Sequence, residues 1–97
     1  MPFRVTLTPS AEADLDYLKR YEQRVIVEAA QRYLRNDAEV ESHHRKQLRA
    51  NPLAPWELRF GKYRVFYELV DVTTVKIVAI GYKEHNDLFI RGRRVQL

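Results

Sequence analysis

The sequence predicts an α+β domain in which two N-terminal helices pack on one face of a small, mainly antiparallel β-sheet. Three observations lead to this fold class. Two helical segments follow a short N-terminal strand, three strand-like segments follow the helices, and 97 residues suffice for one core. Helices followed by a run of strands are typical of two-layer α+β domains, so we expect the order β-α-α-β-β-β with a short C-terminal element. Residues 1–97 are predicted to form a single domain.

The N-terminal segment is predicted to form a strand and then a helix. Residues 3–7 alternate β-branched and apolar side chains, as a strand does. Thr8 and Pro9 are typical of a helix start, because threonine caps the first turn and proline fits its first position. Carboxylates suit the positive end of the helix dipole, and the first turns carry Glu12, Asp14 and Asp16. We expect this helix to end near Tyr21 and the acidic side chains of both predicted helices to face solvent.

A second helix is predicted at residues 22–37, where helix-favouring residues surround an apolar stripe. The stripe consists of Ile26, Ala29 or Ala30, Tyr33 and Leu34. Asn36 and Asp37 favour the end of a helix. Residues 37–55 are polar, then basic, and then contain two prolines. We expect them to form a connection with a short strand at its end.

Three further strands are predicted as an antiparallel meander with short turns. They span residues 56–60, 63–69 and 75–80. The last of them is apolar on most of both faces, which is typical of a central strand. The tail, residues 81–97, is predicted to form a turn or short helix and then an edge strand. With both helices on one face, only loops and the tail remain to cover the other face, which we expect to be the working surface.

Charge and composition limit the compartment and the partners. Residues 1–42 carry six Lys/Arg and eight Asp/Glu, a net charge of −2, whereas residues 43–97 carry eleven and five, a net charge of +6. A basic half beside an acidic half suggests a polyanion on one face, although scattered surface charge explains it equally simply. The chain has no cysteine, which suits a reducing cytoplasm. We find no signal-like or membrane-spanning run, so we expect a cytoplasmic protein with no membrane partner.

Two stretches of the sequence carry a resemblance to a known family. They are PWELRFGKYRVFYEL at residues 55–69 and VAIGYKEHNDLF at residues 78–89. Together with the order of elements, they resemble the RelE/ParE superfamily of toxins from bacterial type II toxin–antitoxin modules. The resemblance implies a RelE-like fold and a protein that arrests its own cell unless a cognate antitoxin binds it. RelE-like members cleave mRNA on the ribosome, whereas ParE-like members share the fold, inhibit DNA gyrase and lack the nuclease residues.

The resemblance implies candidate catalytic residues for RNA cleavage through the 2′-hydroxyl, which leaves 2′,3′-cyclic phosphate ends. Arg64 matches the RelE-family arginine that holds the scissile phosphate. Lys83 stands where many of these nucleases have a second arginine, so the charge is kept but the planar fork is lost. Phe89 lies near the position of a catalytic tyrosine and cannot exchange a proton, although it can stack on a base. His85, two residues beyond Lys83, could supply the proton transfer.

Other cations are predicted to bind RNA through its phosphates. They are Arg45, Lys46, Arg49 and Arg59, with Phe89 as a stacking partner. Each assignment has a structural alternative. The basic residues could form a solvated loop, Phe89 could pack in the core, His85 could be an ordinary surface histidine, and Arg64 could pair with Glu57 or Glu68. Glu57 itself fits a cross-strand partner of Arg64 or Lys62 better than a proton-transfer role.

Neither a cofactor nor a metal is expected, because Arg and Lys can supply the positive charge that phosphate cleavage requires. The adjacent His43 and His44 would point in different directions in an extended chain, which disfavours a metal site there. Three functions therefore remain open. The first is an mRNA endonuclease that works with the ribosome, the second is a ParE-like gyrase inhibitor without nuclease chemistry, and the third is an interaction protein on the same fold. The antitoxin is expected to sit in an apolar groove between the helices and the sheet.

Overall fold

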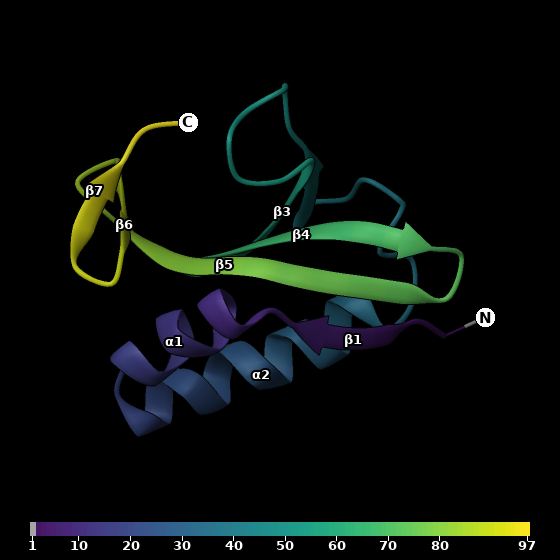
Figure 1. Cartoon of the computed structure of the whole chain (residues 1–97), viewed down its shortest axis with the longest axis horizontal. Helices are drawn as coiled ribbons and strands as arrows, with labels where there is room; N and C mark the ends of the chain where they lie inside the picture. The colour runs from purple at the N-terminus through teal and green to yellow at the C-terminus, as the bar shows by residue number, and fades with distance from the viewer. Residues whose placement is uncertain (1) are drawn as a thin grey trace.

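The computed structural model of the chain describes residues 2–97, which fold into two helices and one sheet of seven strands. The elements are β1 (Arg4–Leu7), α1 (Pro9–Tyr17), α2 (Arg20–Leu34), β2 (Arg45–Gln47), β3 (Trp56–Phe60), β4 (Tyr63–Asp71), β5 (Thr74–Glu84), β6 (Asp87–Ile90) and β7 (Arg93–Val95). Both helices lie on one face of the sheet, and the loop after β2 and the β6–β7 hairpin rise on the other face (Figure 1). The predicted α+β class is therefore confirmed.

The two helices begin as local sequence chemistry requires but end earlier than predicted. Thr8 Oγ1 accepts a hydrogen bond of 3.0 Å from the Ala11 N–H, so the predicted cap of α1 is confirmed. The helix ends at Tyr17 and not near Tyr21, because Leu18 is extended, with φ −84° and ψ 162°. Helix α2 then starts at Arg20 and ends at Leu34, three residues before the predicted end.

The sheet is wider than the predicted meander. The hydrogen-bonded order is β2-β3-β4-β5-β6-β7, and β1 pairs with β5 in parallel. Strand β5 is central, as predicted, because β4 lies on one side while β1 and β6 share the other. One expectation was wrong: the strand in the 37–55 connection is β2, near the middle of that segment and not at its end. The tail takes the turn of the two predicted alternatives, and it ends in the predicted edge strand, β7, which forms a hairpin with β6.

Asp14 fills a gap beside β5. Residues of β5 pair with β1 up to Ile77 and with β6 from Tyr82, and the register against β4 shifts between these two segments. In the gap, the Ile80 N–H donates to Asp14 Oδ2 at 3.0 Å, and Asp14 Oδ1 lies 2.9 Å from Arg91 Nε as an ion pair. The carboxylate thus replaces a missing strand partner.

The expectation that the helical carboxylates face solvent was wrong for two of them. Asp14 is only 2% exposed and Glu22 only 8%. Glu22 accepts from the Lys19 N–H at 3.3 Å and from the Tyr63 hydroxyl at 2.7 Å, so it joins the start of α2 to β4. The Tyr63 hydrogen bond is the largest cause that lowers the pKa of Glu22.

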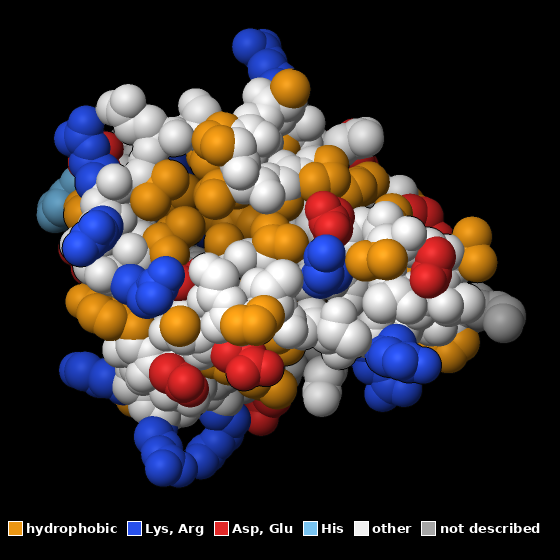
Figure 2. Space-filling model, in the orientation of Figure 1, with side chains coloured by type: hydrophobic (Ala, Val, Ile, Leu, Met, Phe, Trp, Pro, Cys, Tyr) orange, Lys and Arg blue, Asp and Glu red, His pale blue; other side chains and the backbone are white. Residues whose placement is uncertain are grey.

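Each face of the sheet has its own apolar cluster. The larger one joins α2 to the helix-facing side chains of the sheet, such as Leu58, Val65 and Ile77. The smaller one lies on the open face and consists of Ala54, Phe66, Ala79 and Leu88, flanked by Leu48, Leu53, Val78, Ile90 and Val95. Figure 2 shows apolar side chains gathered in a hollow on this face, between the loop after β2 and the β6–β7 hairpin. Burial of Phe66, which is fully covered, contributes about 1.5–3 kcal/mol.

Within residues 2–97, neither helix has the length and apolarity that crossing a bilayer would require.

Candidate nucleic-acid interface

Strand alternation gathers four cations on the open face of the sheet. Side chains of β3 and β4 alternate between the helices and the open face, and Leu58 and Val65 face the helices. Their neighbours Arg59 and Arg64 therefore face the other way, and they are direct cross-strand partners. Lys46 of β2 and Lys83 of β5 are placed on the same face by their registers. Two arginines directly opposite each other repel, so this arrangement costs stability unless an anion lies between them.

Arg64 is held in place by its own turn. Its Nη1 donates to the carbonyl oxygens of Gly61 at 2.9 Å and Tyr63 at 2.8 Å. Its Nε is buried and has no hydrogen-bond partner within residues 2–97. Burial lowers the pKa of Arg64, and Arg59 lowers it further, while Glu57 opposes both effects. A guanidinium anchored in this way presents a fixed positive charge, which is suited to a phosphate contact.

A pocket of about 400 Å³ opens in front of Arg64. It is lined by His43, His44, Lys46, Arg59, Gly61 and Arg64, so no carboxylate lines it. Gly61 adopts a φ of 58°, which a two-residue hairpin turn requires and which a side chain would disfavour. The pocket therefore combines three permanent cations with two imidazole rings, a composition that attracts phosphate.

Lys83 lies on the same face but lines a neighbouring pocket of about 360 Å³, together with Glu57 and Arg94. Glu57 is only 3% exposed, and its Oε1 lies 2.6 Å from Arg59 Nε. The expected ion pair of Glu57 with Arg64 or Lys62 was wrong, because Arg59 takes that carboxylate. Glu68, the other expected partner of Arg64, instead pairs with Lys76 at 3.1 Å.

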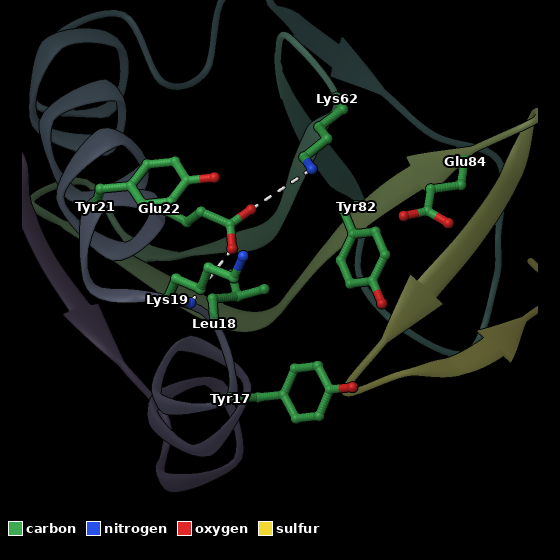
Figure 3. A pocket seen from close by; sticks show the side chains of 8 residues that line it. All are labelled: Tyr17, Leu18, Lys19, Tyr21, Glu22, Lys62, Tyr82 and Glu84. Carbon is green, nitrogen blue, oxygen red and sulfur yellow. Dashed lines mark hydrogen bonds and ion pairs between the residues drawn. The ribbon is translucent and has the colours of Figure 1, made fainter.

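Another pocket of about 360 Å³ lies on the helix side of the sheet and has a different character. Its lining residues are Tyr17, Leu18, Lys19, Tyr21, Glu22, Lys62, Tyr82 and Glu84 (Figure 3). Lys62 Nζ lies 3.5 Å from Glu22 Oε2 and within about 6 Å of two tyrosine ring centres. Because Glu22 neutralises Lys62 and Glu84 adds a negative charge, this pocket is less suited to phosphate than the one in front of Arg64.

Comparison with known proteins identifies the family. A sequence model described as the ParE toxin of type II toxin-antitoxin system, parDE, matches residues 5–86. The chain belongs to the ParE toxin family. Its fold is also similar to a chain in the crystal structure of the toxin-antitoxin complex RelBE2 from Mycobacterium tuberculosis, with a TM-score of 0.71 and 27% identity over 86% of this chain and 100% of that chain. No curated protein matches.

Two of the predicted site residues of this ParE-family toxin lie away from Arg64. His85 is exposed at the tip of the β5–β6 turn, where its φ of 51° and that of Asn86 (69°) form a tight hairpin connection. Phe89 stacks on Tyr82, with ring centres 5.7 Å apart. Tyr82 pairs with Tyr63 and faces the helix side, so Phe89 faces away from the cations of the open face.

Two predicted RNA-binding arginines of the toxin also differ in setting. Arg45 is half-buried and donates to the carbonyl oxygens of Val40 at 2.9 Å and Tyr33 at 3.1 Å, so its guanidinium ties the chain after α2 to the last turn of that helix. Arg49 is exposed in the loop that follows β2. Lys46 and Arg59 therefore remain as the predicted RNA-binding cations that share a pocket with Arg64.

Sequence reasoning missed His44 as a site residue. We considered it only as a metal ligand, and within residues 2–97 no three His, Asp or Glu side chains group as a metal site. Its place beside Arg64 depends on the pairing of the chain next to β2 with β3, where the Arg59 N–H donates to the His44 carbonyl at 2.8 Å. The short polar segment RKQ gives no hydrophobic alternation from which to predict this pairing.

Proposed function

We propose that this toxin is a ribosome-dependent mRNA endonuclease and that its cognate antitoxin inhibits it. The observation that carries this proposal is the pocket of Lys46, Arg59 and Arg64, in which two carbonyl oxygens anchor the Arg64 guanidinium opposite Arg59. A scissile phosphate bound in this pocket would neutralise the two opposed arginines. Positive charge fixed before the reaction stabilises the crowded phosphate of the transition state. No cofactor enters the mechanism, and the products would be 2′,3′-cyclic phosphate ends.

The test is primer extension on cellular mRNA after induction of the toxin and of Arg64→Ala. We expect cuts within translated codons for the unmodified toxin and a decrease of about 100-fold or more in cutting for Arg64→Ala, the cost of removing one transition-state donor. Arg24→Ala is the matched control, because Arg24 is exposed on α2. Growth arrest with intact mRNA would refute the nuclease proposal.

A gyrase inhibitor of the ParE type is the second candidate. The matching family model is that of ParE, and Phe89 is turned away from the pocket in which a nuclease would need its aromatic residue. A supercoiling assay with purified gyrase distinguishes the two candidates. Inhibition of supercoiling together with uncut mRNA would select gyrase as the target.

The antitoxin partner rests on the structural relative, which is a toxin-antitoxin complex. The apolar pocket between the helices and the sheet, where we expected the antitoxin, measures only about 100 Å³. The hollow on the open face is adjacent to Lys83 and so offers a route by which a bound segment would cover the cations. Leu53→Asp in the hollow and Val27→Asp beside the small pocket would show which surface the co-expressed antitoxin needs for capture.

A further inference from the structure

We propose that His44 is the general base of the cleavage reaction, a role that rests on the nuclease function proposed above. His44 lines the same pocket as Arg64, whereas His85, the histidine that the sequence suggested, lies on an exposed turn. The general base must lie near the phosphate-binding cations, because the attacking 2′-hydroxyl is adjacent to the scissile phosphate. Among the described residues, the two imidazoles that share a pocket with Arg64 are those of His43 and His44.

The hydrogen bonding of His44 sets its protonation pattern. Its Nδ1 lies 2.9 Å from the carbonyl oxygen of Arg59. A carbonyl oxygen can only accept, so Nδ1 carries the hydrogen and Nε2 of the neutral ring carries the lone pair. The ring therefore has a free acceptor nitrogen, which is the form that a general base needs.

The position of the His44 ring is also fixed. Its centre lies 4.4 Å from that of Tyr33 on α2 and 6.3 Å from that of Phe60 on β3. The His44 backbone is held at both ends, since its N–H donates to Ser42 Oγ at 3.2 Å and its carbonyl accepts from the Arg59 N–H at 2.8 Å. Fixed orientation is what distinguishes a catalytic group from a mobile surface histidine. His43 is exposed and meets His44 only edge to face, at 5.1 Å.

Glu57 is the other candidate base on this face, and its setting is unfavourable. Its carboxylate is buried and its Oε1 is held by Arg59 Nε at 2.6 Å. Glu57 does not line the pocket in front of Arg64, and Arg59 already occupies its Oε1. Glu57 therefore positions Arg59 in this scheme.

In the reaction that we propose, His44 and solvent water exchange the protons while the phosphate stays among the cations. Nε2 of His44 removes the proton of the 2′-hydroxyl, the 2′-oxygen forms a bond to phosphorus, and the bond from phosphorus to the 5′-oxygen breaks. The leaving 5′-oxygen takes a proton from water, since the pocket is open to solvent. Lys46, Arg59 and Arg64 neutralise the phosphate during these steps, and His44 then gives its proton to the hydroxide that remains, which restores water and the neutral ring.

The experiment measures single-turnover cleavage of mRNA on purified ribosomes at saturating toxin, together with the Kd of each variant for the programmed ribosome. We expect His44→Gln to slow cleavage by about 100-fold or more while its Kd stays within about threefold of the unmodified toxin. We expect His44→Ala to be slow and to regain at least tenfold in rate with added imidazole, which a purely structural role would not permit. Circular dichroism of both variants checks that they fold.

Four outcomes overturn the proposal. Cleavage by His44→Gln at a rate within threefold of the unmodified toxin removes the assignment and leaves the nuclease function intact. A loss that appears in Kd alone makes His44 a binding residue. A loss that follows His85→Gln and spares His44→Gln moves the base to the hairpin tip. An unmodified toxin that leaves mRNA uncut defeats the nuclease function itself, and the assignment falls with it.

Discussion

Replacement of Asp14 by alanine tests whether this carboxylate substitutes for a missing strand. The change removes the acceptor of the Ile80 N–H, which is buried beside the bulge in β5. An unsatisfied buried donor costs about 1–3 kcal/mol. The change also releases Arg91, whose side chain is half exposed, so that loss adds less than about 1 kcal/mol. We expect the free energy of unfolding to fall by about 1–4 kcal/mol in total.

Urea unfolding followed by circular dichroism measures this loss, and amide hydrogen exchange at Ile80 localises it. Asp14→Asn is the matched control, because the side-chain carbonyl can still accept from the Ile80 N–H while the charge is lost. We expect the asparagine variant to recover the larger part of the stability. If Asp14→Ala unfolds within 0.5 kcal/mol of the unmodified protein, or if exchange at Ile80 is unchanged, the carboxylate does not replace a strand partner.

Three further changes test other contacts of the fold. Tyr63→Phe removes the main cause of the lowered pKa of Glu22 and should cost about 1–3 kcal/mol at neutral pH. Because the pKa of Glu22 is lower in the folded protein, its ionised carboxylate stabilises the fold above the usual pKa of 4.5, and this stabilisation is lost as the pH falls through the folded pKa. Urea unfolding of Tyr63→Phe and of the unmodified protein should therefore show a smaller difference in free energy of unfolding at pH 3 than at pH 7. Gly81→Ala would place a Cβ atom against the carbonyl oxygen of Phe89. We expect thermal unfolding to show a decrease of about 1–3 kcal/mol in the free energy of unfolding. An unchanged midpoint would mean that β6 moves aside without cost. Arg45→Ala removes one hydrogen bond to Tyr33 in the last turn of α2 and one to Val40 beyond it. We expect the free energy of unfolding measured in urea to fall by about 1 kcal/mol or more, whereas an equal midpoint would mean that Arg45 is an ordinary surface cation.

Most of the sheet could be predicted because its pattern is local. Residues 56–80 alternate apolar and polar side chains around turns with clear chemistry, so β3, β4 and the start of β5 follow directly. Arg64 could be predicted as a site residue because it lies within that regular pattern. The ion pairing around Arg64 could not be predicted, because side-chain geometry decides whether Glu57 pairs with Arg59 or with Arg64.

The failures of prediction have a common cause in long-range pairing. From the sequence, Asp14 is predicted to be a solvent-facing carboxylate near the start of a helix. Its buried role follows only from the structure, in which β1 and β6 leave part of β5 without a neighbouring strand. Phe89 was grouped in the sequence with the RNA-binding cations, and only its register against Tyr82 shows that it lies on the other face of the sheet. His44 belongs to the pocket only because residues next to β2 pair with β3. None of these pairings can be predicted from a hydrophobic periodicity in the sequence.

The parallel pairing of β1 with β5 has a consequence for how the toxin is made. Arg4 lies beside Thr74, so the N-terminal strand finds its place only after most of the chain has been synthesised. Closing so long a loop is slow, because the chain loses conformational entropy before the stabilising contacts between β1 and β5 have formed. A ribosome that has not yet translated β5 therefore carries a nascent chain with an incomplete sheet. The sheet around β1 is therefore complete only after β5 has been translated.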